Sequence, residues 1–353
     1  MSKQNNISCK HNKGYSLHVR MCVVMLFFFF ASFTTIAQDL HFSQFMFSPL
    51  STNPANAGFI PDADYRLGAN YRNQYSEVMT QPYKTYSVYG DAQVMREQLT
   101  SGWIGLGAVL LSDVAGSGAL TSNKAYASLA YHQMLGQSSL LSAGFNLGWV
   151  SKSINTANLK FPDQFDGRFF DNNLPTSVQL QNTSINYFDL QAGINYAYFP
   201  TDDIYLNAGY SIHHVNRAKE SFFASSINER IPQRHIGFAQ ASIKCNDRLI
   251  LHPSVYYTNQ RQSSSLLFGT IGNINLSERG ERQLLVGTYY RWNESIIPMV
   301  GFELHHFQFL FNYDVTLSGL KQYNMGRGAA EISITKKGFY GNPDVKQVIC
   351  PSF

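Results

Sequence analysis

Residues 307–315 read FQFLFNYDV, and this stretch decides the fold of the chain. Its odd positions carry Phe, Phe, Phe, Tyr and Val, whereas its even positions carry Gln, Leu, Asn and Asp. Successive side chains of a β-strand point to opposite faces, so the stretch predicts a strand with one aromatic face and one largely polar face. Such a strand suits a wall with lipid on one side and a polar interior on the other.

The same alternation recurs along most of the chain. Clear runs occupy 65–72, 141–149, 188–198 and 204–213, and weaker ones occupy 84–92, 103–112, 124–133, 234–244, 249–259, 265–276, 283–292, 296–305 and 328–335. The total is about fourteen strands, mostly of the length that crosses a bilayer at a tilt. Pro253 and Pro298 weaken two of them, because proline lacks the N–H that a sheet needs. We therefore predict an all-β chain whose residues 65–340 form a transmembrane antiparallel β-barrel of the outer-membrane type.

The first 37 residues have the composition of a secretory signal peptide. Four basic side chains and no acidic one precede the apolar run MCVVMLFFFF at 21–30, and small residues at 35–37 offer a cleavage site. The apolar run is too short for comfortable membrane spanning. We expect residues 1–37 to be removed, which would place the mature chain in the cell envelope.

Charge and composition agree with a membrane barrel rather than a nucleic-acid-binding protein. Without the four basic residues of the signal, 23 Lys and Arg balance 23 Asp and Glu, so the net charge of +4 disappears. Charged residues make up 14% of the chain, well below the ~25% that is usual in soluble domains. The mean hydropathy of −0.19 is what a barrel gives when its polar lumen offsets its apolar exterior.

Two regions lack the strand period. Residues 38–64 are rich in Phe, Pro and Asn, and we expect them to be ordered inside the barrel or at its periplasmic mouth, because their apolar side chains must find a protein surface. Residues 155–186 form a long polar loop, a kind that barrels place on the cell exterior, and 215–233 form a second candidate. The end of the chain, 341–353, is expected to be a tail.

Several polar side chains within the strands are expected to face the lumen, because a charge on the lipid face is costly. The charged ones among them are interpreted as members of an ion network across the lumen. The full set is Arg66, Arg72, Asp189, Asn195, Arg291, Glu303, Asp314 and Glu331.

No motif indicates an enzyme, a cofactor or a metal site. The chain has no nucleophile elbow, P-loop or H-E-x-x-H sequence. Adjacent histidines at 213–214 and 305–306 would point to opposite faces of a strand, which is poor geometry for a shared metal. Cys245 and Cys350 are the cysteines of the mature part, and they could form a disulfide or remain free thiols.

The start of the mature chain carries a specific sequence resemblance. Residues 38–45 read QDLHFSQF, Pro49-Leu50 follow, and residues 53–58 read NPANAG. This opening, with YRNQ at 71–74 and the close CPSF at 350–353, resembles the PorP/SprF family of type IX secretion system membrane proteins. The similarity extends over essentially the whole mature chain.

The resemblance implies a non-enzymatic outer-membrane barrel of the type IX secretion and gliding machinery. Such a protein would secrete or anchor surface proteins, such as large adhesins with C-terminal sorting domains, and its partners would be machinery proteins, a secreted substrate and membrane lipid. An alternative is a FadL-like transporter of hydrophobic small molecules. Within the opening segment, the residues expected to contact partners are Phe42, Phe45, Phe47, Asn53, Pro54 and Gly58.

Overall fold

The structure is a computed structural model that describes residues 42–116, 119–156, 159, 161–171, 174–178, 182–222, 229–277 and 281–341. The signal peptide expected at 1–37 lies outside these residues, as does nearly all of the tail expected at 341–353, including Cys350. Cys245 is an exposed free thiol. Among the described residues, no helix has both the length and the hydropathy needed to cross a membrane.

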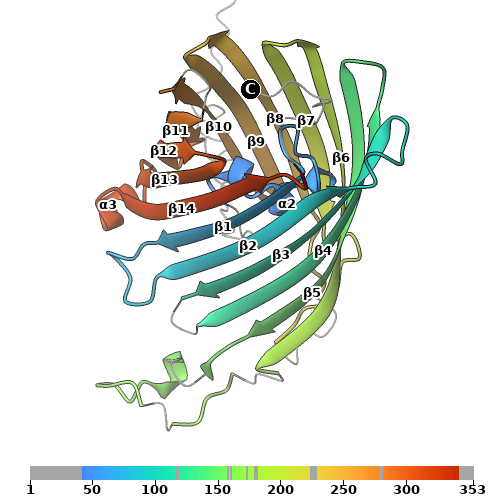
Figure 1. Ribbon diagram of the computed structural model, residues 1–353. Coiled ribbons are helices and arrows are strands. Elements are labelled where there is room, and N and C mark those ends of the chain that lie inside the picture. The colour runs from blue at the N-terminus through green and yellow to red at the C-terminus, as the bar shows by residue number, and fades with distance from the viewer. Residues whose placement is uncertain are drawn as a thin grey trace, which may run out of the picture. The chain divides into compact units, whose positions relative to one another are not determined.

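Fourteen antiparallel strands form a closed barrel (Figure 1). They are β1 (Tyr65–Gln74), β2 (Tyr83–Val94), β3 (Gly102–Ala115), β4 (Leu120–Met134), β5 (Ser139–Ser153), β6 (Ser184–Thr201), β7 (Ile204–His213), β8 (Arg234–Asn246), β9 (Leu249–Gln260), β10 (Ser263–Asn275), β11 (Arg282–Arg291), β12 (Ser295–Leu304), β13 (Phe307–Thr316) and β14 (Arg327–Gly338).

The ring closes by pairing of the first strand with the last. The β1–β14 ladder runs from Tyr65 opposite Gly338 to Gln74 opposite Ala329, and every other strand pairs with its neighbours in sequence. The prediction of a closed barrel of about fourteen strands is confirmed. Pro253 and Pro298, which weakened two of the predicted strands, lie within β9 and β12.

Burial alternates along the strands as the sequence pattern predicts. On β6, Phe188 and Ile194 are 60% and 56% exposed on the outer face, whereas Asp189 and Asn195 are buried on the inner face. Because the side chains that point outward are apolar, the outer face has the character of a lipid contact surface.

The two ends of the barrel differ in their connections. The long segments 154–183 and 214–233 and the segment 317–326, which contains α3 (Lys321–Asn324), all follow odd-numbered strands and so lie at one end. Turns of two residues, 202–203, 247–248 and 305–306, lie at the other end, where β1 begins and β14 ends. Outer-membrane barrels have short periplasmic turns, so the end with the long segments is the extracellular one.

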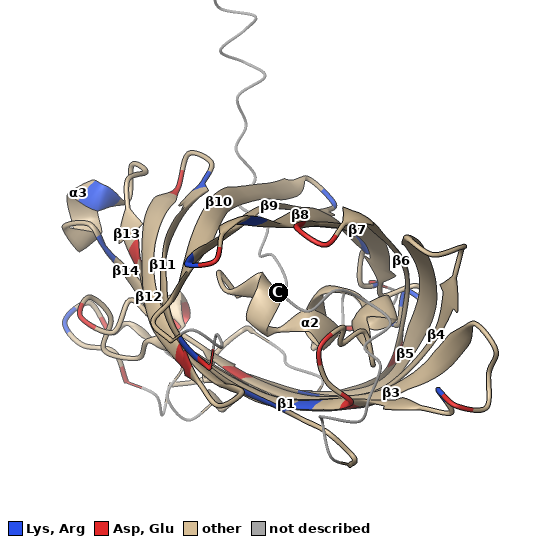
Figure 2. Ribbon diagram, turned by 45° about the horizontal axis from the view of Figure 1, so that its top comes forward, with Lys and Arg blue, Asp and Glu red and all other residues tan. Residues whose placement is uncertain are grey.

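The segment before β1 lies inside the ring. It contains η1 (Phe45–Phe47), α2 (Pro49–Thr52) and η2 (Pro54–Asn56), and Figure 2 shows α2 surrounded by the strands. We call residues 42–64 the plug. Three of its apolar side chains, Phe45, Leu50 and Phe59, each belong to a separate buried cluster with side chains of the wall.

The lumen is drier than the alternation of polar residues suggested. Around Phe45, the inner faces of β8 to β13 carry a continuous apolar cluster that includes Leu285 and Leu310. In a water-filled lumen the side chain of Asn312 would be solvated. Here Asn312 is fully buried and contacts the plug. The polar interior that the alternation predicts is therefore only part of the lumen, because the plug turns the rest into an ordinary protein core.

We expect Ile194→Arg to impair assembly of the barrel into the membrane far more than Ser184→Arg. Ile194 lies near the middle of β6 on the outer face, where an arginine costs about 2–4 kcal/mol at the bilayer midplane, and Ser184 lies at the extracellular end of the same strand. The fraction of protein that migrates as a folded, heat-modifiable barrel measures the difference. Equal yields of the two variants would mean that the outer face of β6 does not contact lipid.

Candidate functional site

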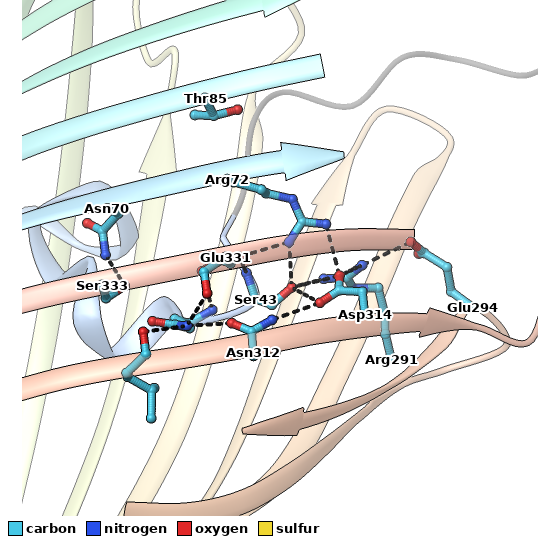
Figure 3. Close-up of polar contacts among 12 residues, drawn as sticks. Ser43, Asn70, Arg72, Thr85, Arg291, Glu294, Asn312, Asp314, Glu331 and Ser333 are labelled. Carbon is cyan, nitrogen blue, oxygen red and sulfur yellow. Dashed lines mark hydrogen bonds and ion pairs between the residues drawn. The ribbon is translucent and has the colours of Figure 1, made fainter. Parts of the chain in front are cut away.

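A buried cluster of charges attaches the start of the plug to the wall (Figure 3). Arg72 of β1 forms ion pairs with Asp314 of β13 (2.9 Å) and Glu331 of β14 (2.8 Å), and Arg291 of β11 lies 3.2 Å from Asp314. The backbone N–H groups of Ser43 and Gln44 donate to the two oxygens of Glu331, at 3.0 and 2.9 Å. We call Ser43, Arg72, Arg291, Asp314 and Glu331 the latch.

The Ser43 hydroxyl lies at the centre of the latch. Both arginines donate to its Oγ, from Arg72 at 2.7 Å and from Arg291 at 2.6 Å, and the hydroxyl donates to Asp314 at 3.0 Å. Two positive and two negative side chains balance, and all are buried. A buried charge is tolerated only with such pairing, so the wall positions of the latch depend on one another and on the plug.

Glycines in the wall form the seat for the middle of the plug. A Cβ on Gly105 of β3 would lie 1.8 Å from the carbonyl oxygen of Ala57, and one on Gly193 of β6 would lie 2.0 Å from the Asn53 side chain. The Asn53 amide donates to the carbonyl of Ile194 at 2.9 Å. Only a residue without a side chain lets the plug backbone approach the sheet this closely.

The periplasmic end of the plug is held by a second set of polar contacts. Gly58, at a φ of +65°, donates its N–H to Asp91 at 2.9 Å, and Asp91 also pairs with Arg66 at 2.8 Å. The indole of Trp103 donates to the Gly58 carbonyl at 2.9 Å, and the ring of His132 stacks on that indole. The turn into β1 is thus fixed by the wall rather than by its own sequence.

Asp62 adds an ion pair at the same end. Its carboxylate lies 2.6 Å from the Lys337 ammonium of β14. Burial by itself would raise the pKa of Asp62, but the charge of Lys337 and its hydrogen bond hold that pKa below the ordinary value. Asp62 therefore stays ionised, and the pair persists until the pH falls through its lowered pKa.

The eight polar residues singled out in the strands do not form one network. Arg72, Arg291, Asp314 and Glu331 come together in the latch, whereas Arg66 pairs with Asp91. The other three make their hydrogen bonds and ion pairs with different partners. Asp189 pairs with His214 at 2.8 Å, Asn195 donates to Asn56 at 3.0 Å, and Glu303 accepts from Gln308 at 2.8 Å.

The residues expected to contact partners lie within the lumen. Phe42, Phe45, Asn53, Pro54 and Gly58 are buried, and Phe47 is half-buried. These side chains pack against the wall because the plug has no other surface to cover them. Their contact with partner proteins stays a prediction, and it would require the plug to move. Sequence reasoning missed Ser43, Asp91, Trp103 and His132, whose partners lie far away in the chain.

A cavity of about 250 Å³ remains between the plug and the wall in the periplasmic half of the barrel. Phe45, Phe47, Phe238, Ile271 and Leu285 supply an apolar part of its lining. Its polar lining residues include Asn207, Gln240, His252, Asn273 and Gln283. Within the described residues, no group of three or more His, Cys, Asp or Glu side chains is placed to hold a metal ion.

We expect Glu331→Gln to destabilise the barrel by about 3–5 kcal/mol, because removing one carboxylate of the buried cluster leaves Arg72 and Arg291 to share the single buried carboxylate of Asp314. The matched control is Glu77→Gln, which removes an exposed pair with Arg327 and should cost about 0–1 kcal/mol. The urea midpoint of the detergent-solubilised barrel measures both. Similar midpoints for the two variants would contradict a structural role of the latch.

We expect Gly105→Ala to displace the plug and to open the lumen. The added methyl group would overlap the Ala57 carbonyl, whereas the same change at Gly237 of β8 meets no atom within 4 Å and serves as the control. Ion conductance in planar bilayers should rise for Gly105→Ala and stay at the wild-type level for Gly237→Ala. An unchanged conductance of a correctly folded Gly105→Ala barrel would mean that the plug tolerates the shift.

Structural comparison finds similar barrels of very different sequence. The deltaS2 mutant of the TodX monoaromatic hydrocarbon channel superposes with a TM-score of 0.50 at 11% identity, over 83% of this chain and 94% of that chain. The Ralstonia pickettii toluene transporter TbuX gives 0.48 at 10% identity, over 82% and 93% of the two chains. A Pseudomonas aeruginosa FadL homologue gives 0.47 at 10% identity, over 81% and 92%. At these identities the likeness concerns the fold alone.

Comparison with curated proteins finds no match. The family model described as type IX secretion system membrane protein PorP/SprF matches residues 34–335, which include the plug and all of the barrel except its last residues. The resemblance read from the opening QDLHFSQF and NPANAG is thereby confirmed over most of the chain. This outer-membrane β-barrel belongs to the PorP/SprF family of type IX secretion system membrane proteins.

Proposed function

We propose that this protein is a non-enzymatic anchor that holds secreted proteins with C-terminal sorting domains, such as large adhesins, at the cell surface. Membership of the family supports an association with the type IX secretion machinery. The plug is the observation that favours an anchor over a conduit for secreted proteins. It fills the lumen and leaves a cavity of about 250 Å³, far below the space that a polypeptide domain needs.

The extracellular end offers apolar side chains for such an anchor. In the segment 317–326, Tyr323 and Met325 are 79% and 80% exposed, and Leu317 and Leu320 are also exposed. Exposed aromatic and methionine side chains are enriched where proteins bind one another. We call these four residues the α3 surface.

The long segment 154–183 adds aromatic side chains at the same end. Phe165 and Phe170 form a bridge across a small hairpin with their rings 5.0 Å apart, and Phe169 is 64% exposed. The backbone and hydroxyl of Ser177 and the hydroxyl of Thr176 donate to Asp163, which lowers the pKa of that carboxyl. The segment therefore has internal structure on which a partner could dock.

A second candidate is a transporter of hydrophobic small molecules. The apolar part of the cavity lining favours it. The latch and the glycine seat argue against free passage through the barrel, because they hold the plug to opposite parts of the wall.

The test of anchoring uses the α3 surface. We expect the double variant Tyr323→Ser, Met325→Ser to release the sorting-domain protein into the medium, because loss of central interface side chains costs about 2 kcal/mol or more each. The control is Leu276→Ser, at an apolar residue that is 65% exposed in a periplasmic turn. Immunoblots of cells and medium measure the distribution. Complete retention of the substrate by the double variant, with the barrel at its normal level, would contradict the α3 surface as the anchor.

A further inference from the structure

We propose that the lumenal cavity binds a single-chain amphiphile, a hydrocarbon tail with a small polar head, that enters from the membrane between β8 and β9. The proposal concerns a different part of the molecule from the α3 surface and does not depend on anchoring. Three observations carry it: the composition of the cavity, a buried histidine nitrogen that has no partner among the described residues, and a break in the backbone ladder beside that histidine.

The cavity has separate apolar and polar parts of the kind that an amphiphile requires. Phe45 of the plug packs between Tyr256 and Tyr289 of the wall, and Phe238, Ile271 and Leu285 belong to the same buried cluster. The polar lining includes Gln308 and Lys337, near the ends of β13 and β14 where the periplasmic turns begin. A tail would thus contact the apolar cluster, and a head would face the polar side chains.

His252 supplies an unused hydrogen-bonding group in the cavity lining. Its Nδ1 lies 2.8 Å from the Ser242 hydroxyl on the neighbouring strand, whereas its Nε2 is buried and has no partner among the described residues. When the serine donates to Nδ1, the imidazole proton resides on Nε2, which then needs an acceptor. A carboxylate, ester or hydroxyl head would provide one and would remove the cost of an unsatisfied buried group.

The backbone ladder between β8 and β9 is broken at the same place. The β8–β9 ladder passes from Gln240 opposite Ser254 to Ile243 opposite Leu251, and no ladder pair is formed by the two positions between them. At one of these positions Ala241 lies opposite Pro253, which has no N–H to donate. At the other, Ser242 lies opposite His252, and their side chains provide a hydrogen bond between the two strands.

An apolar depression lies on the outer side of this interruption. Its lining includes Ala239, Ala241 and Pro253 together with the larger Leu206, Val255 and Phe268. Asn207 and Gln240 line both the depression and the inner cavity, so a single layer of sheet separates the two. Because the outer face here is the lipid contact surface, the occupant that the depression meets is a lipid hydrocarbon chain.

The experiment uses the purified full-length barrel in phospholipid vesicles that contain a palmitic acid analogue with a photoactivatable diazirine in its tail. After illumination, mass spectrometry locates the label. We expect label on lumenal residues such as Phe238 and Leu285. Ile271→Trp, which fills the cavity, should reduce lumenal label about tenfold, whereas Ile296→Trp on the outer face of β12 should not.

The route is tested with a reversible lock. The variant carries Ala239→Cys and Val255→Cys, which lie opposite each other beside the interruption and leave Pro253 in place, in a background with Cys245→Ser and Cys350→Ser, so that a disulfide can join the two strands there. We expect oxidation to abolish lumenal label while label on the outer depression remains, and reduction to restore it in the same sample. Lumenal label that persists in the oxidised lock would overturn entry between β8 and β9. Absence of lumenal label in the wild-type barrel, or label unaffected by Ile271→Trp, would overturn the site itself.

Discussion

Hydrocarbon offers no hydrogen-bonding partner to a peptide group, and this constraint governs the whole molecule. Each backbone N–H and C=O within the bilayer must be satisfied by the sheet, so the sheet has to close on itself. Closure by β1 and β14 creates an inner surface, and a ring of fourteen strands is too wide for its own side chains to fill. The plug follows from that geometry: it covers the inner surface with backbone and with the side chains of Phe45, Leu50 and Phe59.

The sequence reveals the strands because the pattern that specifies them is local. Alternation in FQFLFNYDV is visible within nine residues, and the same holds for the segment that became β6. The plug could be expected from its apolar content, since apolar residues without a strand period need another surface. Its contacts could not be predicted, because Ser43 and Glu331 are separated by almost the entire chain and share no local signal.

Two features of the wall depend on contacts that the local sequence does not show. The strands that contain Pro253 and Pro298 form as predicted, and each proline lies where the ladder with one neighbouring strand lacks two pairs while the ladder with the other neighbour continues. The inner face of β13 was predicted to be largely polar, and Leu310 shares it with the buried Asn312 and Asp314. In the sequence, an apolar residue on the inner face looks like a break in the alternation of apolar and polar residues. Its role becomes clear only when its packing partner is known, which is here the cluster around Phe45.

The latch joins the beginning of the described chain to its end. Ser43 precedes every strand, whereas Asp314 and Glu331 belong to the last two. Ser43 is therefore synthesised and exported well before Asp314 and Glu331. The charges of the latch can be neutralised only when β13 and β14 have joined β1. A chain cut short before β13 would leave Arg72 without either carboxylate and the plug without its first attachment. The contacts of the latch thus make the position of the plug depend on completion of the barrel.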